Sequence, residues 1–206
     1  MKKNDYRGVF IAFDGPNGAG KTTLIRLVEM RLKELGFDIL VTNEPTSTCL
    51  GEYVRDFSET HRGIGLACLV MCDRYEHLNN EIVPALQKGQ IVITDRYVLS
   101  SLIFQGIDGV DTGFIMSICS EMTKPDLQIA VYANAEILRE RLSDRVNLTR
   151  FEKENQSKNE LFFMRKGIDL FRKEEIIVKE IDNNEHVEHN VEMIISSIEK
   201  IRREKM

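Results

Sequence analysis

Residues 15–22 of the chain read GPNGAGKT, and this octet decides the fold class. It matches the phosphate-binding loop pattern G-x-x-x-x-G-K-[ST] at every fixed position. The apolar run at residues 9–13 (VFIAF) comes just before the octet and is typical of a buried strand. Residues 22–35 follow it with apolar side chains at helical spacing, at Leu24, Leu27, Val28, Leu32 and Leu35. A strand, a glycine-rich loop and a helix in this order predict a loop that binds a polyphosphate.

The residue types of the octet suit this chemistry. Glycines let the backbone wrap a polyphosphate with its N–H groups pointing inward, and the helix N-terminus adds partial positive charge. Lys21 can reach the terminal phosphates, and the Thr22 hydroxyl can hold Mg²⁺. A glycine-rich turn that binds nothing is the alternative, but the flanking strand and helix disfavour it. We therefore expect a nucleotide at Gly15, Asn17, Gly18, Ala19, Gly20, Lys21, Thr22 and Thr23.

Length and composition favour a soluble globular protein with one α/β domain spanning residues 1–206. The net charge of −5 argues against a surface that coats nucleic acid. No apolar run approaches the roughly 18 residues of a membrane helix. The first five residues, MKKND, do not open a signal peptide. We expect a cytoplasmic protein without nucleic-acid or membrane partners.

Strand patterns alternate with helical patterns along the whole chain. The strand candidates are residues 9–14, 38–42, 90–95, 126–132 and 176–181. The helix candidates are residues 22–35, 51–59, 66–88, 112–123, 135–144, 160–173 and 187–203. This alternation predicts a five-stranded parallel sheet with helices on both faces. Ligands of such sheets bind beyond the carboxyl ends of the strands.

Two further polar groups follow predicted strands at that edge. Glu44 comes after the second strand, and Asp95 and Arg96 end and follow the third. The Asp95 carboxylate can hold Mg²⁺ through water and position a phosphate acceptor. Arg55, Arg74 and Arg96 suit a second phosphate facing the first, because guanidinium groups bind phosphate bidentately. Surface ion pairs are the alternative for each arginine taken alone.

Residues 145–159 (RVNLTRFEKENQSKN) break the alternating pattern. The segment is polar, highly charged and poor in packing residues, which predicts a mobile surface excursion. Beside a phosphate loop, such a segment can close as a lid. A solvated loop without such a role is the alternative.

Six segments resemble, in order, the motifs of the thymidylate (dTMP) kinase family. They are residues 13–23 (FDGPNGAGKTT), 42–45 (TNEP), 72–77 (CDRYEH), 95–106 (DRYVLSSLIFQG), 125–127 (PDL) and 150–152 (RFE). The fourth is similar to D-R-Y-x-x-S-S-x-A-Y-Q-G, the most specific motif of the family. The resemblance covers nearly the whole chain and implies a P-loop NTPase-type three-layer sandwich.

The resemblance also implies an activity and residue roles. The expected reaction is the transfer of a phosphoryl group from ATP to dTMP with Mg²⁺, which serves dTTP synthesis in a homodimeric enzyme. Lys21, Asp95, Arg96 and Arg150 would act in catalysis, since Gly18 stands where some members carry an arginine and the lid then supplies it. Arg145 would lie near adenine. The acceptor would contact Glu44, Arg55, Val70, Arg74, Arg96, Ser100, Ser101, Phe104 and Gln105.

Four positions depart from the family pattern, and all surround the expected acceptor. Asn17 replaces an acidic residue, Asn43 an arginine, Val70 an aromatic residue and Phe104 a tyrosine. Valine cannot stack on a base as a ring does, and phenylalanine lacks a hydroxyl for the sugar. The same chemistry on another nucleoside monophosphate or on a deoxynucleoside is therefore an alternative. A non-catalytic P-loop switch or binding module is a third one.

Overall fold

The computed structural model describes residues 1–143, 145–146, 148–154 and 156–205. In this part of the chain, one parallel sheet has the strand order β2-β3-β1-β4-β5. The strands are β1 (Val9–Asp14), β2 (Ile39–Asn43), β3 (Ile91–Asp95), β4 (Leu127–Tyr132) and β5 (Val178–Asp182). The predicted strands are thus confirmed, with boundaries that differ by two residues or fewer. Strands β1, β3 and β4 are almost wholly buried, as expected for the centre of a sheet covered on both faces.

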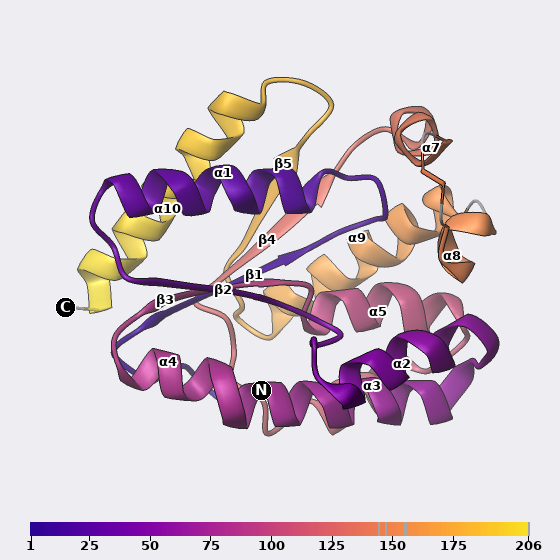
Figure 1. The fold of residues 1–206 in the computed structure, drawn as a ribbon. Coiled ribbons are helices and arrows are strands. Elements are labelled where there is room, and N and C mark those ends of the chain that lie inside the picture. Colours follow the sequence, from indigo (N-terminus) through magenta and orange to yellow (C-terminus); the bar gives the residue numbers. More distant parts are fainter. Residues whose placement is uncertain (144, 147, 155, 206) are drawn as a thin grey trace.

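Helices cover both faces of the sheet, which confirms the three-layer α/β fold (Figure 1). Helices α1 (Lys21–Glu34) and α10 (Val187–Lys205) lie on one face. The opposite face carries α3 (Gly63–His77), α4 (Val83–Gln87), α5 (Val98–Ile107) and α9 (Ser157–Lys173). Two apolar cores result, one on each side of β1. Of the remaining helices, α2 (Cys49–Thr60) packs on α3, and α6 (Thr112–Ile118) lies beside α5.

The single helix expected at residues 66–88 is wrong in detail. The chain forms α3, then a π-helical turn at Leu78–Ile82, and then α4. Pro84 stands in the first turn of α4 and has no N–H to continue the i→i−4 ladder, and the wider turn occurs just before it. Apolar periodicity continues through this change, so the pattern alone does not reveal it.

Helix α5 was not predicted, although residues 95–106 attract attention as a motif. Its residues from Val98 to Gly106 are all buried, so the helix has no exposed face that would give a clear helical period. The helix expected at 112–123 ends at Ile118. The predicted helix was too long because Cys119 and Met122, which are buried beyond its end, continue the apolar pattern. Helix α7 (Ala135–Ser143) agrees with the prediction up to Ser143, and Asp144 lies outside the described residues.

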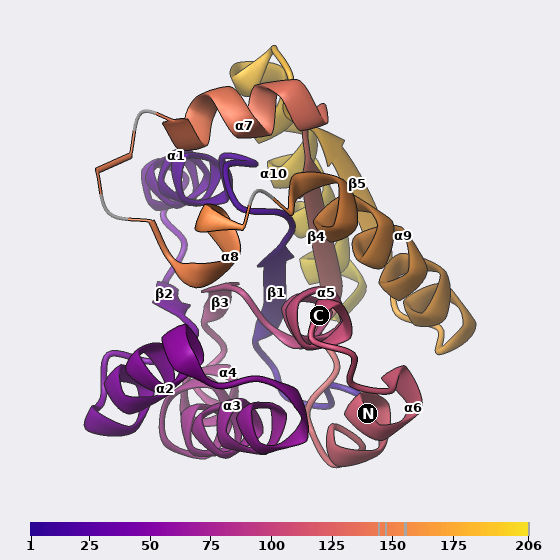
Figure 2. The ribbon, with the colours of Figure 1, turned by 90° about the vertical axis from the view of Figure 1, so that its right-hand side faces the viewer.

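The described part of segment 145–159 is more structured than expected. Helix α8 (Arg150–Lys153) begins with a capping box, in which Thr149 and Glu152 bond each other's backbone and side chain. Arg150 and Glu152 are buried, so these residues do not form a solvated loop. Helix α9 begins at Ser157, three residues before the expected start. Figures 1 and 2 place α8 at the edge where the strands end.

Candidate active site

The phosphate loop joins β1 to α1 and is held by its surroundings. Gly15 has φ +151°, and a Cβ atom there would lie 2.0 Å from the Val131 carbonyl oxygen of β4. Gly20 has φ +89°, and its Cβ would lie 2.4 Å from the Asn183 side chain. That side chain donates to the Ala19 carbonyl over 2.8 Å. These two positions require glycine for conformation and for space.

Lys21 is the first residue of α1 and is buried, with 6% of its surface exposed. Its Nζ donates to the carbonyl oxygens of Gly15 and Pro16 over 3.0 and 2.9 Å. Burial and the nearby Arg96 guanidinium lower the pKa of Lys21 to about 8, although the carboxylates of Asp95, Asp14 and Glu160 oppose this effect. A poorly solvated ammonium group therefore stands at the loop, where a phosphate would stabilise its charge.

Thr22 and Asp95 come together as the sequence predicts. The Thr22 hydroxyl donates to Asp95 Oδ2 over 2.8 Å, while Asp95 Oδ1 is buried and has no hydrogen-bond partner among the described residues. A hydroxyl and a carboxylate oxygen at one point suit Mg²⁺, which prefers oxygen ligands and keeps several waters. No group of three His, Cys, Asp or Glu side chains in the described ranges could hold a metal ion. The residues thus fit a cation shared with water and phosphate.

Arg96 faces the phosphate loop from the end of β3. Its backbone has φ +79°, which is uncommon for a residue other than glycine. The Arg96 amide donates to the Phe13 carbonyl over 2.8 Å, and its carbonyl accepts from Thr94 over 2.9 Å. Its Nη2 donates to Asn17 Oδ1 over 2.7 Å, and the guanidinium carbon lies 5.0 Å from the Phe104 ring centre. The strained backbone therefore directs the guanidinium between the loop and the acceptor residues.

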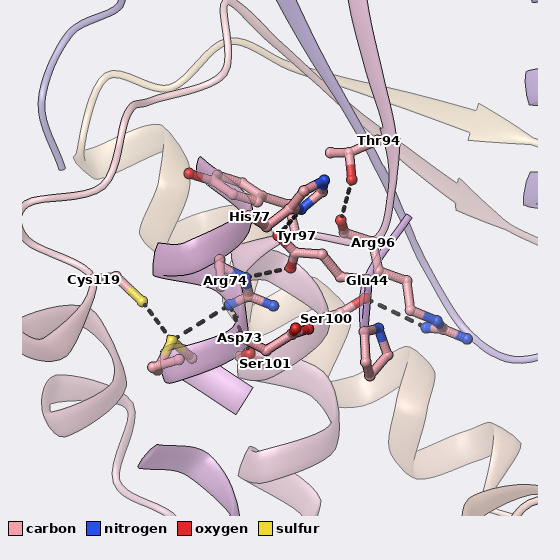
Figure 3. Close-up of polar contacts among 12 residues, drawn as sticks. Glu44, Asp73, Arg74, His77, Thr94, Arg96, Tyr97, Ser100, Ser101 and Cys119 are labelled. Carbon is pink, nitrogen blue, oxygen red and sulfur yellow. Dashed lines mark hydrogen bonds and ion pairs between the residues drawn. The ribbon is translucent and has the colours of Figure 1, made fainter. Parts of the chain in front are cut away.

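Arg74 lies deeper, with 2% of its surface exposed, and is held by several groups (Figure 3). Its Nε donates to Glu44 Oε2 over 2.5 Å and its Nη1 to Ser101 Oγ over 3.0 Å. The other oxygen of Glu44 lies 3.1 Å from His77 Nδ1. Since Glu44 directly follows β2 and Arg74 belongs to α3, this ion pair connects two walls of the site. The guanidinium has a fixed place and orientation.

One cleft of about 670 Å³ connects these groups. Val70, Phe104 and Gln105 line its acceptor side, as does Arg55, which donates to the carbonyls of Thr46 and Pro45. The predicted site residues in its lining are Asn17, Gly18, Gly20, Lys21, Thr22, Thr23, Glu44, Arg55, Val70, Arg74, Asp95, Arg96, Ser100, Ser101, Phe104, Gln105 and Arg145. The structure therefore gathers most of the predicted site in one place.

Comparison with known proteins decides the family. A family model described as thymidylate kinase matches residues 13–194. The chain belongs to the thymidylate kinase family. A thymidylate kinase of Caldicellulosiruptor saccharolyticus is 36% identical over 203 residues, which cover 95% of this chain and 96% of that protein. A thymidylate kinase of Thermomicrobium roseum is 40% identical over 153 residues, covering 70% and 73%. In the described residues of this family member, no helix is long and apolar enough to cross a membrane.

Arg150, expected to act in catalysis in this thymidylate kinase family member, does not line the cleft. Its two terminal nitrogens donate to the Asp108 carboxylate over 2.8 and 2.7 Å, and its Nε donates to the Ser58 carbonyl over 2.9 Å. Gly15 and Ala19 also lie outside the lining. Arg145 does line the cleft and pairs with Glu152 over 2.5 Å. The structure thus separates Arg150 from the other expected catalytic groups, and its role stays a prediction.

Three carboxylates around the site were not predicted to have a role in it. Asp14 is buried behind the loop and accepts from the amides of Tyr97 and Ser100, both over 2.9 Å. Burial raises the pKa of Asp14, against hydrogen bonds from Ser100, Tyr97 and Gln128. Asp73 accepts from the Thr46 amide over 2.8 Å. Glu160 reaches the loop from α9. Asp14 and Asp73 belong to quoted motifs, which is a usable signal, whereas Glu160 carries none.

Proposed function

We propose that this chain phosphorylates dTMP to dTDP, with ATP as the donor and Mg²⁺ as the cofactor. One observation carries the proposal. A single cleft is lined by a phosphate loop with Lys21 and Thr22, by the Asp95 carboxylate, by the buried Arg74 and by the partly buried Arg96. Two phosphate-binding groups that face one space suit transfer between two nucleotides. The names of the similar proteins support dTMP as the acceptor.

On the donor side, this proposal assigns the ATP phosphates to the loop amides and Lys21. Lys21 now donates to two loop carbonyls and would exchange them for phosphate oxygens. The charged ammonium would stabilise negative charge that builds up during transfer, in a place with little water. Thr22 and Asp95 would hold Mg²⁺, which neutralises phosphate charge when bound.

On the acceptor side, Arg74 and Arg96 would hold the phosphate of the monophosphate. Both guanidinium groups are fixed by protein contacts, to Glu44 and Ser101 and to Asn17 respectively. A fixed cation loses little freedom when the phosphate binds, and it keeps the attacking oxygen in line. Ser100 Oγ lies 3.4 Å from Arg96 Nη1 and limits its rotation. Arg55 would complete this cationic wall.

Several finer points belong to the same proposal. We take residues 1–206 as one kinase domain whose segment 145–159 acts as a lid. Arg150 would leave Asp108 and complete the site when the lid closes. The family resemblance supports a homodimer, and we keep the cytoplasmic location as the expectation drawn from the composition of the sequence. The base would lie against Val70 and Gln105 and the sugar near Phe104, all of which line the cleft.

The test is steady-state phosphorylation of dTMP, dUMP, dCMP, dAMP, dGMP and thymidine, with ATP and Mg²⁺. We expect a strong preference for dTMP. Preference for another acceptor would favour the alternative that Val70 and Phe104 change specificity. Binding of ATP without turnover of any acceptor would favour a nucleotide-binding switch. Lys21→Ala is the control, and it is expected to abolish turnover while the circular dichroism spectrum stays unchanged.

A further inference from the structure

One buried carboxylate beside the phosphate loop has no role in the mechanism proposed above. Glu160 lies in the first turn of α9, and 1% of its surface is exposed. Its Oε2 accepts a hydrogen bond from the backbone amide of Asn17 over 2.6 Å. The two residues are far apart in sequence, so only the tertiary fold brings them together. A carboxylate removed from water this completely needs partners that stabilise its charge.

The partners of Glu160 belong to the catalytic machinery. Burial raises the pKa of Glu160, while the Asn17 amide and the charges of Arg96 and Lys21 oppose that rise. Reciprocally, Glu160 is one of the carboxylates that keep Lys21 protonated against burial and against Arg96. Asp95 and Asp14 act on Lys21 more strongly, and they also bond Thr22 and the amides of Tyr97 and Ser100. Glu160 differs from them because it accepts a hydrogen bond from a backbone amide of the loop itself, that of Asn17.

A line of contacts leads from Glu160 to the acceptor side. The Asn17 amide binds Glu160, and the Asn17 side chain accepts from Arg96 Nη2 over 2.7 Å. Arg96 in turn lies 3.4 Å from Ser100 Oγ. Asn17 therefore has its backbone fixed by one charged group while its side chain fixes another. Displacement of Glu160 would shift Asn17 and release the guanidinium.

We propose that Glu160 is a positioning residue, which fixes Asn17 and thereby Arg96, and which supplies from α9 the negative charge that position 17 lacks. Position 17 itself carries an uncharged asparagine side chain. A carboxylate from α9 occupies the same neighbourhood, 2.6 Å from that residue. The kinetic test of this inference rests on the proposed function, whereas the contacts from Glu160 through Asn17 to Arg96 do not depend on it.

The proposal predicts that a carboxylate at position 17 can replace the one at position 160. Glu160→Gln keeps an acceptor for the Asn17 amide and removes the charge. Asn17→Asp alone places a second carboxylate against Glu160, which is unfavourable for like charges. The double variant restores one carboxylate, now on the loop, where it pairs directly with Arg96. Reciprocal rescue of this kind separates a shared charge from two unrelated defects.

The experiment compares kcat and KM for dTMP and for ATP in the wild type, the two single variants and the double variant. Glu160→Gln is expected to lower kcat/KM for dTMP roughly fivefold to tenfold, because a neutral hydrogen bond replaces a charge-assisted one. Asn17→Asp should also lose activity, and the double variant should recover to within about threefold of the wild type. Asp169→Asn, an exposed charge change on the same helix, should have no effect.

The outcomes separate this inference from the proposed function. A wild type that does not phosphorylate dTMP overturns the function, and the same four proteins are then compared for MgATP binding by equilibrium dialysis. In that case, weaker binding in each single variant with recovery in the double variant supports the inference. Losses that simply add in the double variant overturn it. A lowered melting temperature of Glu160→Gln with unchanged kcat and KM also overturns it, since that describes a merely structural residue.

Discussion

The buried ammonium of Lys21 leads to a paired prediction about stability and activity. Burial, followed by repulsion from Arg96, lowers its pKa from 10.5 to about 8 in the folded, ligand-free protein. The unfolded chain therefore binds more protons than the folded one between about pH 8 and 10.5. Stability contributed by this group must rise with pH across that window, and below pH 8 the protonated lysine opposes folding.

The magnitude follows from the two pKa values. At a pH where Lys21 is deprotonated in both the folded and the unfolded state, the free energy of unfolding is roughly 3 kcal/mol higher than at low pH, at about 1.4 kcal/mol for each tenfold change in proton affinity. Between pH 7 and 10 most of the effect is expressed, which is about 2.5 kcal/mol of unfolding free energy. Because other lysines, tyrosines and cysteines also titrate there, the measured quantity is the difference between the wild type and Lys21→Met.

The assay is urea unfolding of the ligand-free proteins from pH 7 to 10. The chain has no tryptophan, so circular dichroism at 222 nm is the appropriate signal. We expect Lys21→Met to be the more stable protein at pH 7 and to lose this advantage as the pH rises. Exposed Lys88, substituted by methionine, is the control. Parallel pH dependence of the wild type and Lys21→Met would refute the argument that burial depresses this pKa.

The same titration predicts the activity profile, because only the protonated lysine stabilises phosphate charge. The value of kcat/KM for ATP reports groups of the free enzyme, so it should fall above about pH 8. Lys21→Met should bind MgATP weakly and turn over at background level. The lysine thus costs stability at neutral pH in order to serve the site, as functional residues often do.

Three further predictions concern the metal, the acceptor and the lid. Asp95→Asn keeps a partner for Thr22 but removes the charge. The value of kcat should therefore fall by roughly 100-fold or more and depend less on Mg²⁺ concentration. Unchanged Mg²⁺ dependence in steady-state assays would contradict the metal assignment. Val70→Phe combined with Phe104→Tyr should raise kcat/KM for dTMP by roughly fivefold through base stacking and a regained hydroxyl, and no gain in the nucleotide panel would show that these positions do not set specificity. Asp108→Ala leaves Arg150 without its buried partner, so the unfolding free energy should fall by about 3 kcal/mol in urea titrations. A variant as stable as the wild type would mean that this ion pair does not hold α8 in place.

The sequence predicts the sheet and the site for the same physical reason. The central strands are buried on both faces, so in the sequence they are short apolar runs bounded by glycine, proline and polar residues. Parallel strands share one carboxyl edge, so motifs after β1, β2 and β3 had to meet there. Lys21, Thr22, Asp95 and Arg96 could therefore be placed together before any coordinates. Only the parallel direction of the strands was needed, and the alternating pattern of strands and helices predicted it.

What could not be predicted depends on contacts between distant segments. Helix α5 has no exposed face, so its burial removes the periodicity that reveals other helices. Arg150 lies in a charged stretch, and nothing in the local sequence indicates that it forms an ion pair with Asp108, 42 positions earlier. Glu160 is one of many glutamates in the sequence until the fold places it against Asn17. Pairings of this kind are decided by packing of α8 and α9, which local patterns do not encode.

The two halves of the cleft differ in how far they are prepared for their substrates. On the acceptor side, Arg74 and Arg96 are already fixed by Glu44 and by Asn17, and a phosphate can bind without moving them. On the donor side, Lys21 bonds loop carbonyls and must turn toward the incoming phosphates, while Asp95 Oδ1 lacks a partner. A preorganised acceptor site contributes orientation at no further cost, whereas the donor site gains its geometry only with nucleotide and cation bound. In the proposed function, ATP binding would therefore complete the electrostatic arrangement around Lys21, and the rigid arginines would then determine where the acceptor phosphate lies.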